Sequence, residues 1–196
     1  MNRVYSYLSA GLTELTFTTD IKGFDYSHIC RQMQEQITGS DARCLRLMLI
    51  GLEPHRQMPY WYVEAAKSPC RYIREYAGYD CLLRNAQAVA AAKKMNVEPQ
   101  DYIVGEYDET TLPEEIKPAL ALTDILAREE QIDKLRWQKA NEITIFNLFD
   151  IDYLLAYLTK AAIVDRWIKL DKTKGEAFFR LLVSEVRGTF DIRKAI

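Results

Sequence analysis

The sequence predicts an all-α protein, a bundle of several helices, and three observations point to it. Apolar residues recur every three or four positions along most of the chain, which is the spacing of one helix face. Glycine and proline, the main turn-forming residues, are few, at 8 and 6 of 196 residues. A β-sandwich or β-barrel, with its many turns between strands, would need more of them. A hydrophobic content of 48% supports a core. We expect one helical domain over 1–196, with halves 1–95 and 113–196 around an acidic loop, 96–112, as an alternative division.

The stretch Ser68–Lys94 predicts the longest helix. Ser68 suits an N-cap, and Pro69 suits the first helical position, where the missing N–H costs nothing. An apolar stripe follows at helical spacing and consists of Tyr72, Tyr76, Tyr79, Leu83, Ala86 and Ala90. The helix ends at Lys93 and Lys94, whose charge suits the negative end of its dipole.

A polar trio lies beside that stripe. Asp80 and Arg84 are four residues apart with the acid first, which is the favourable order for a helical ion pair, and Asn85 lies further round the helix. We interpret Asp80 as a structural residue that pairs with Arg84. We expect Arg84 and Asn85 to contact a neighbouring protein.

Three segments precede this helix. Residues 4–17 fit neither the strand nor the helix period and are left open between a strand and a short helix. Asp25 is expected to cap a helix that runs to about Ile37. Ser40 is expected to cap a second helix to about Leu52, so that the two form a helical hairpin.

An aromatic run follows over residues 58–66, where Tyr60, Trp61 and Tyr62 are consecutive. Three adjacent aromatic side chains cannot all face one core on a helix. Either one of them is exposed and contacts a partner, or the run lies between two packed layers. Trp61 and Tyr62 are therefore candidates for a partner interface as well as for the core.

The stretch 96–113 is irregular, with a short strand expected at 102–104. From Glu98 to Asp133 there are 11 acidic residues against two basic ones. This charge asymmetry fits either a solvated surface or an electrostatic docking site for a basic partner.

The remaining chain predicts three more helices. Pro113 or Pro118 begins one that continues to about Ile145. Residues 150–170 are apolar nearly all round, which indicates a helix buried by neighbours on several sides. Asp171 is expected to cap a last helix that ends at Gly188, followed by a basic tail.

Aligning the sequence with itself at an offset of 70 residues reveals a weak internal repeat, which we call the internal echo. Two aromatic residues three apart, then an aspartate, then an apolar helix occur around Asp80 and again around Asp150. In this alignment Phe146 and Phe149 correspond to Tyr76 and Tyr79. The echo is either a coincidence among helical patterns or a duplicated unit, in which Asp80 and Asp150 cap or join equivalent helices.

The cysteines and histidines lack metal-ligand spacing. They are Cys30, Cys44, Cys70, Cys81, His28 and His55. The thiols lie in helical patterns, which indicates reduced, buried side chains without a role in binding. Phosphate-binding, dinucleotide-binding, zinc-protease and serine-hydrolase motifs are absent from the sequence. We expect no catalytic residue, no cofactor and no metal.

Charge argues against nucleic-acid binding, and hydropathy argues against a membrane-spanning segment. A net charge of -2 and a pI near 5.8 give no basic footprint for nucleic acid. No apolar run approaches the roughly 18 residues that a membrane span needs. We expect no secretory signal in the N-terminal residues, and we expect a cytoplasmic protein.

Three stretches resemble one known family. The opening Tyr5-Ser6-Tyr7-Leu8-Ser9-Ala10-Gly11-Leu12 is similar to a Tyr-x-Tyr-Leu-x-Ala-x-Leu pattern. Residues 76–94 resemble a family pattern of aromatic and acidic residues followed by Leu-Arg-Asn and an Ala-rich run. Residues 150–170 resemble the features with which the family's sequences close: an Asp, then Leu-Leu-Ala-Tyr-Leu, then Arg-Trp. These patterns resemble a small bacterial family encoded beside V-type rotary ATPase genes and, more distantly, the C subunit of the V/A-type ATPases.

The resemblance implies a non-catalytic accessory subunit that couples the central stalk of a proton- or sodium-transporting ATPase to its membrane ring. Its partners would be central-stalk and membrane-ring subunits, and it would lie in the cytoplasm, peripheral to the membrane. The C subunit itself is larger, with three related helical units, and this chain has room for two at most. An all-helical enzyme, a small-molecule-binding protein and a generic helical scaffold remain the alternatives.

Overall fold

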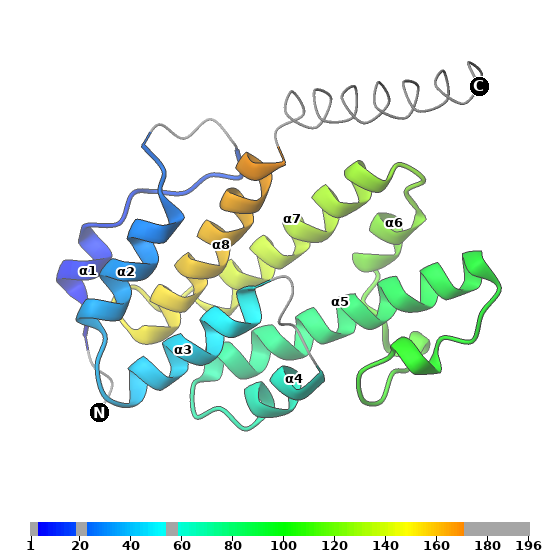
Figure 1. Ribbon diagram of the computed structural model, residues 1–196, viewed down its shortest axis with the longest axis horizontal. Coiled ribbons are helices and arrows are strands. Elements are labelled where there is room, and N and C mark those ends of the chain that lie inside the picture. Colours follow the sequence, from blue (N-terminus) through cyan, green and yellow to red (C-terminus); the bar gives the residue numbers. More distant parts are fainter. Residues whose placement is uncertain (1–3, 19–22, 54–58, 171–196) are drawn as a thin grey trace, which may run out of the picture.

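The computed structural model describes residues 4–18, 23–53 and 59–170, and all regular structure in these ranges is helical (Figure 1). The α-helices are α1 (Ser6–Ala10), α2 (Tyr26–Gln36), α3 (Ser40–Leu52), α4 (Pro59–Ala66), α5 (Arg71–Met95), α6 (Ile116–Ala121), α7 (Ile125–Ile143) and α8 (Ile151–Lys169). Two 3-10 turns, Gln100–Tyr102 and Glu109–Thr111, lie between α5 and α6. The predicted all-α fold is confirmed. The last predicted helix and the basic tail lie outside the described residues.

Helix α8 lies at the centre of the bundle, in contact with α2, α3, α5 and α7. Figure 1 shows it in yellow to orange between α2 and α7. Its residues Leu154, Leu155 and Leu158 are fully buried. The prediction that residues 150–170 are covered on several sides is therefore confirmed.

The described residues form two apolar cores. The larger core takes side chains from α1, α2, α3, α4, the first half of α5, the end of α7 and α8. The smaller core lies between the second half of α5, α6 and α7, around Leu83, Ile116 and Ile132. Because α8 shares the larger core with α2 and α3, segments from both proposed sequence halves pack in one interior.

The N-terminus of α5 differs from the prediction. The helix begins at Arg71 with Cys70 as its N-cap residue, and the Ser68 hydroxyl accepts a hydrogen bond from the Cys70 N–H at 3.2 Å instead of capping the helix. The Tyr72 N–H donates at 3.4 Å to the Asp152 carboxylate of α8. A side chain from another helix therefore supplies a cap that local sequence cannot reveal.

The helix predicted from residue 113 to 145 is wrong in its continuity, because it is divided into α6 and α7. Asp124 breaks it: its carboxylate accepts a hydrogen bond at 3.0 Å from the Leu126 N–H and so caps α7. Leu122 before it has extended backbone angles.

The strand predicted at 102–104 is also wrong. Tyr102 ends a 3-10 turn, and the backbone of Val104 bonds to the side chain of Asn85 instead of to another strand.

The N-terminal segments are close to their predictions. Of the two alternatives for residues 4–17, the structure has a short helix, α1. Asp25 caps α2 as predicted, since its carboxylate accepts the His28 N–H at 3.0 Å. Ser40, however, is the first residue of α3, and the N-cap is Gly39, whose φ of 68° favours glycine.

The aromatic run forms α4, with Trp61 and Tyr62 buried and Tyr60 exposed. The Trp61 indole N–H donates to the Leu47 carbonyl of α3 at 2.7 Å. The run therefore packs between α3 and α5, and Trp61 and Tyr62 are core residues. Their candidacy for a partner interface is not supported, because a contact residue needs an exposed side chain.

Candidate partner-docking surface

Six large apolar side chains are exposed around the connection between α7 and α8 and on the neighbouring N-terminal segment. We call this set the docking surface, and it consists of Val4, Tyr7, Ile145, Phe146, Leu148 and Phe149. Tyr7 is 97% exposed and Phe146 94%. A soluble monomer rarely keeps so many large apolar side chains together in water, and such groups mark interaction sites. Aromatic residues are also enriched in protein interfaces.

Hydrogen bonds hold the connection of residues 144–150 in place. Arg71 of α5 donates to the Ile143 carbonyl at 2.7 Å and to the Asn147 side chain at 2.8 Å. Asn147 in turn donates to Asp150, whose carboxylate accepts the Tyr153 N–H at 3.1 Å and caps α8. The apolar side chains of the connection therefore project from a fixed backbone, which lowers the entropy lost on binding.

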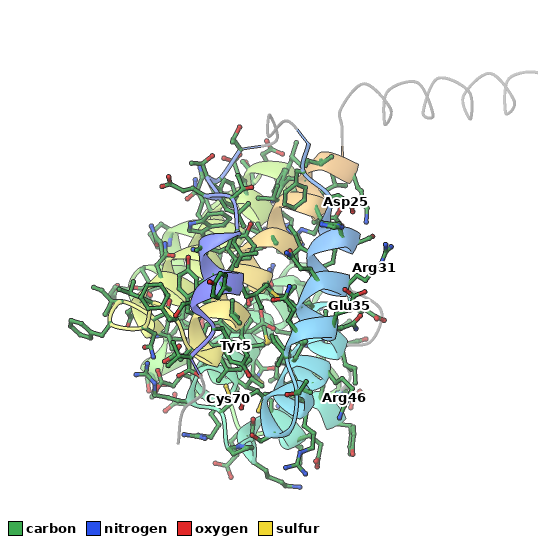
Figure 2. The ribbon with its side chains drawn as sticks, turned by 90° about the vertical axis from the view of Figure 1, so that its left-hand side faces the viewer. Tyr5, Asp25, Arg31, Glu35, Arg46 and Cys70 are labelled. Atoms are coloured by element: carbon green, nitrogen blue, oxygen red, sulfur yellow. The ribbon has the colours of Figure 1, made fainter. Side chains whose placement is uncertain are left out.

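The N-terminal part of the docking surface is fixed to the same connection. The Tyr5 N–H donates to the Phe149 carbonyl at 2.6 Å, and the Tyr5 hydroxyl donates to Asp41 of α3 at 2.7 Å. Leu8 is buried in the larger core. Figure 2 shows Tyr5 at the start of α1, on the side of the molecule that faces the viewer. Anchored by Tyr5 and Leu8, α1 leaves Tyr7 in solvent.

Two ion pairs and one unpaired carboxylate, Asp150, lie on the helices and the connection that carry the docking surface. Lys139 binds Glu142 at 3.0 Å, and Arg71 lies 3.5 Å from Asp152. Both cations named here, Lys139 and Arg71, are thus paired with carboxylates.

A buried polar cluster lies deeper in the molecule and contains Asp80. Its carboxylate binds the Arg136 guanidinium of α7 at 2.7 Å and accepts the Tyr62 hydroxyl at 2.8 Å. The sequence pattern pointed to Arg84 as the ion-pair partner, whereas the observed partner is Arg136. Burial and the Asp80 carboxylate both raise the pKa of Tyr62, so its hydroxyl stays a donor.

Asp133 extends this cluster to α8. Its carboxylate binds Arg136 at 3.0 Å, accepts the Trp167 indole N–H at 2.8 Å and binds Arg166. Burial alone would lower the pKa of Arg136, but Asp80, Tyr76 and Asp133 together raise it. Two aspartates and two arginines therefore join α4, α5, α7 and α8. Each charge in the cluster lies against an opposite charge, and Glu129 also lies 3.7 Å from Arg166; this is the arrangement of a structural bridge.

Asn85 is buried and serves as a clamp inside the molecule. Its amide donates to the Val104 carbonyl and accepts the Val104 N–H, each at 2.9 Å. Both hydrogen-bonding ends of the side chain are used within the chain and the residue is 2% exposed, so the structure gives no support to the prediction that Asn85 contacts a partner. Arg84, next to it, is half-buried and already makes an interaction within the protein.

The two aspartates of the internal echo have different surroundings. Asp150 caps the start of α8, whereas Asp80 lies in the middle of α5 and joins it to α4 and α7. The aromatic residues of the echo also differ: Tyr76 is buried, while Phe146 and Phe149 are exposed.

The sequence contained a signal for the docking surface that helical periodicity alone does not detect. Ile145, Phe146, Leu148 and Phe149 lie between the end of one helical stripe and the N-cap Asp150. Apolar residues in a connection have no helix face to bury them. Four of them in five positions are therefore a sign of an exposed apolar loop.

A groove of about 410 Å³ lies between α4, α5 and the segment after Val104. Several of its polar side chains are already bonded to the protein. Tyr62 is bonded to Asp80, Arg74 to the Ser68 carbonyl, and Asn85 to Val104. The groove therefore offers a small molecule less polar recognition than its residue types suggest.

The described residues hold no group of three or more His, Cys, Asp or Glu side chains placed for a metal ion. Among the described helices, none has the length and hydropathy of a membrane span.

Comparison with known proteins returns one family. The family model described as "Protein of unknown function (DUF2764)" matches residues 52–189, which is more than half of the chain. No curated protein and no solved structure matches the chain. The matched range contains the 144–150 connection with its four apolar side chains, whereas Val4 and Tyr7 lie before it.

Proposed function

We propose a function for this chain on the premise that it belongs to the DUF2764 family of proteins of unknown function. The protein is a non-catalytic accessory subunit of a bacterial V-type rotary ATPase, which binds central-stalk and membrane-ring subunits from the cytoplasmic side. The docking surface is its principal contact. The identity of the partner rests on the resemblance of residues 5–12, 76–94 and 150–170 to the ATPase-associated family.

The docking surface is the observation that carries the proposal. Phe146 and Tyr7 are almost fully exposed, although the backbone beneath them is held by the Tyr5–Phe149 and Arg71–Ile143 hydrogen bonds. Exposure of these side chains is unfavourable in the isolated chain by about 25 cal/mol for each Å² of apolar surface. A partner that covers them recovers this free energy.

A protein partner fits the surface better than a lipid surface does. Segments that lie on membranes combine apolar side chains with an excess of Lys and Arg, which attract anionic headgroups. Here Lys139 is neutralised by Glu142, and Arg71 by Asp152. Exposed aromatic side chains whose neighbouring cations are already paired are more typical of a protein interface than of a membrane-binding surface.

Arg84 remains in the proposal as a secondary contact. It is half-buried on α5, within the Leu-Arg-Asn stretch that resembles the ATPase-associated family. The residue is partly exposed, and it also makes an interaction within the chain, so a contact with a neighbouring subunit would be an additional one.

The test is recovery of ATPase subunits by the tagged full chain in its native host. Recovered stalk and ring subunits are quantified by mass spectrometry for the wild type, for a Phe146→Ser, Phe149→Ser variant, and for a control. The control, Ile125→Ser with Leu126→Ser, removes two exposed apolar side chains at the start of α7. We expect at least a roughly tenfold lower recovery for the first variant, since losing two interface anchors costs more than about 1.4 kcal/mol.

Both variants should melt at nearly the wild-type temperature, because the altered side chains are exposed. Equal recovery by the two variants would contradict the role of the docking surface. Recovery of other proteins without any stalk or ring subunit would contradict the ATPase assignment. Binding of the wild type to anionic vesicles that is lost in the Phe146→Ser, Phe149→Ser variant would identify a membrane instead of a protein partner.

A further inference from the structure

Another groove lies at the far end of α7 from the docking surface, between the end of α5, the end of α6 and the first turns of α7. It has a volume of about 360 Å³, which is within the size range of small-molecule sites. We call this space, between residues 87–95 of α5 and 128–129 of α7, the α5–α7 groove. Figure 1 shows α6 and the end of α5 on the opposite side of the molecule from α1. A ligand in this groove therefore leaves the docking surface uncovered.

The floor of the α5–α7 groove is apolar. Ala90 and Ala91 line it from α5 with methyl groups, which are too short to fill the space. Leu120 lines it from α6 and packs against the smaller core. Met95, the last residue of α5, lies beside them and is 64% exposed. A hydrocarbon chain laid on these side chains would remove apolar surface from water on both sides of the contact.

Two cations line the same groove without a carboxylate partner. Lys94 is exposed in the last turn of α5, and it makes no hydrogen bond or ion pair with any residue that the structure describes. Arg128 on α7 donates to the Leu122 carbonyl at 3.4 Å, and no ion pair joins it to a described acid. A guanidinium has five N–H donors, so this bond leaves most of them available to a ligand.

The lack of a carboxylate beside Arg128 is unexpected at this place in the chain. Residues 98–133 contain 11 acidic residues against two basic ones, and Arg128 is one of the two. The other, Lys117, is paired with Glu114 at 2.5 Å. Arg128 thus keeps its charge clear of carboxylates in the segment where they are most frequent, which favours a role towards an external anion.

The one acid that lines the groove is already bound within the protein. Glu129 accepts a hydrogen bond from the Gln87 amide at 3.1 Å, and the Arg166 guanidinium of α8 lies 3.7 Å from it. Two cations and one engaged carboxylate leave the lining with an excess of positive charge, which attracts anions.

We propose that the α5–α7 groove binds a small amphiphilic anion, a carboxylate with a hydrocarbon chain of medium length. The chain covers the apolar floor, and the carboxylate binds Lys94 and Arg128. Bonds from lysine and arginine to a carboxylate are charge-assisted and are among the stronger hydrogen bonds in proteins. A short carboxylate lacks the apolar contact, and an alcohol of the same chain length lacks the charge.

The test titrates the full chain, labelled with ¹³C at its methionine methyl groups, with sodium decanoate below its micelle concentration. Met95 lines the groove, whereas Met33 and Met48 are fully buried in the larger core and serve as reference signals. A Met95→Leu variant assigns the signal. We expect the Met95 signal to shift and the two reference signals to stay. Octanoate should bind up to about fifteenfold more weakly, since each buried CH₂ group contributes up to about fourfold.

Two variants separate the contributions of charge and of apolar contact. Lys94→Gln with Arg128→Gln should weaken decanoate binding at least about tenfold, because both contacts to the carboxylate are lost. The matched control, Lys93→Gln with Lys117→Gln, removes the same charge from two exposed lysines that are paired with glutamates, and it should bind like the wild type. Ala91→Leu fills the groove from an exposed helical position and should also weaken binding at least about tenfold. This variant keeps the test valid where Arg128→Gln does not fold.

Three results would overturn the proposal. The first is equal affinity of the Lys94→Gln, Arg128→Gln variant and its control. The second is binding of decanol as tight as that of decanoate, which would remove the requirement for charge. The third is a Met95 signal that does not shift at millimolar decanoate. A shift with an acidic, leucine-containing peptide in that third case would assign the groove to a protein partner instead.

Discussion

Asp80 and Asp133 are carboxylates with side chains 2% exposed, held between helices by Arg136, which is itself 15% exposed. Removing such charges from water is costly, and only close pairing with further hydrogen bonds offsets the cost. Asp80 has both, with Arg136 on one oxygen and the Tyr62 hydroxyl on the other. The pair therefore specifies how α4, α5 and α7 meet more than it adds net stability.

Asp80→Ala is expected to lower the free energy of unfolding by about 3–5 kcal/mol, because it leaves the Arg136 guanidinium and the Tyr62 hydroxyl without their buried partner. Urea unfolding followed by circular dichroism measures the change. The control is Glu64→Ala, which breaks the exposed Glu64–Lys67 pair and should cost about 0–1 kcal/mol. A loss for Asp80→Ala as small as that of the control would show that the cluster is not a structural bridge.

At the scale of elements, Gly51 allows the Trp61 ring of α4 to lie directly against the backbone of α3. A methyl group added at Gly51 would lie 2.0 Å from the Trp61 ring, which rests on the α3 backbone and donates to the Leu47 carbonyl. The close approach of the two helices therefore requires the absence of a side chain at position 51.

Gly51→Ala is expected to destabilise the protein by about 1–3 kcal/mol, since Trp61 must move out of a packed position. Gly78→Ala is the matched control: position 78 is also helical, on α5, and nothing lies within 4 Å of an added methyl group. That change should stabilise the protein by about 0.5–1 kcal/mol through helix propensity. Thermal melting of both variants measures the contrast. A Gly51→Ala variant that melts above the wild type would disprove the packing argument.

At the scale of the whole molecule, the tertiary structure neutralises much of the acidic segment 98–133. Asp133 is buried with Arg136 and Arg166, and Asp124 caps α7. Two further acids bind lysines: Glu109 binds Lys93, and Glu114 binds Lys117. The electrostatic field around this segment is consequently weaker than its count of 11 acidic residues suggests.

We expect association with the proposed partner subunit to slow as salt rises. The on-rate should fall less steeply with salt than it would if all eleven acidic residues were unpaired. The on-rate is measured by surface plasmon resonance between about 0.05 and 0.5 M salt, a range over which the screening length shortens strongly. Glu98→Gln, Asp101→Asn, Glu106→Gln removes three exposed acids and should flatten this dependence. The control Glu64→Gln lies outside the segment and should leave it unchanged. A salt-independent on-rate for the wild type would count against electrostatic docking.

The predictable part of the fold was the part that depends on residues close in sequence. Hydrophobic periodicity predicted α2, α3, α5 and α8, because a helix face is set by residues three and four apart. Asp25 and Asp150 act as caps through N–H groups three residues on, which is also a local relation. The break at Asp124 was equally local and was missed, because an apolar stripe continued on both sides of it.

Only the tertiary structure decided which side chains are buried, paired or exposed. The partner of Asp80 is 56 residues away, and the cap from Asp152 reaches α5 from 80 residues away. Trp61 and Tyr62 are covered by α3 and α5, while Phe146 and Tyr7 are left in solvent. The type of an element follows from local hydrogen bonding and periodicity, which the sequence determines by itself. The environment of a side chain follows from the packing of segments distant in the chain, and no local pattern encodes it.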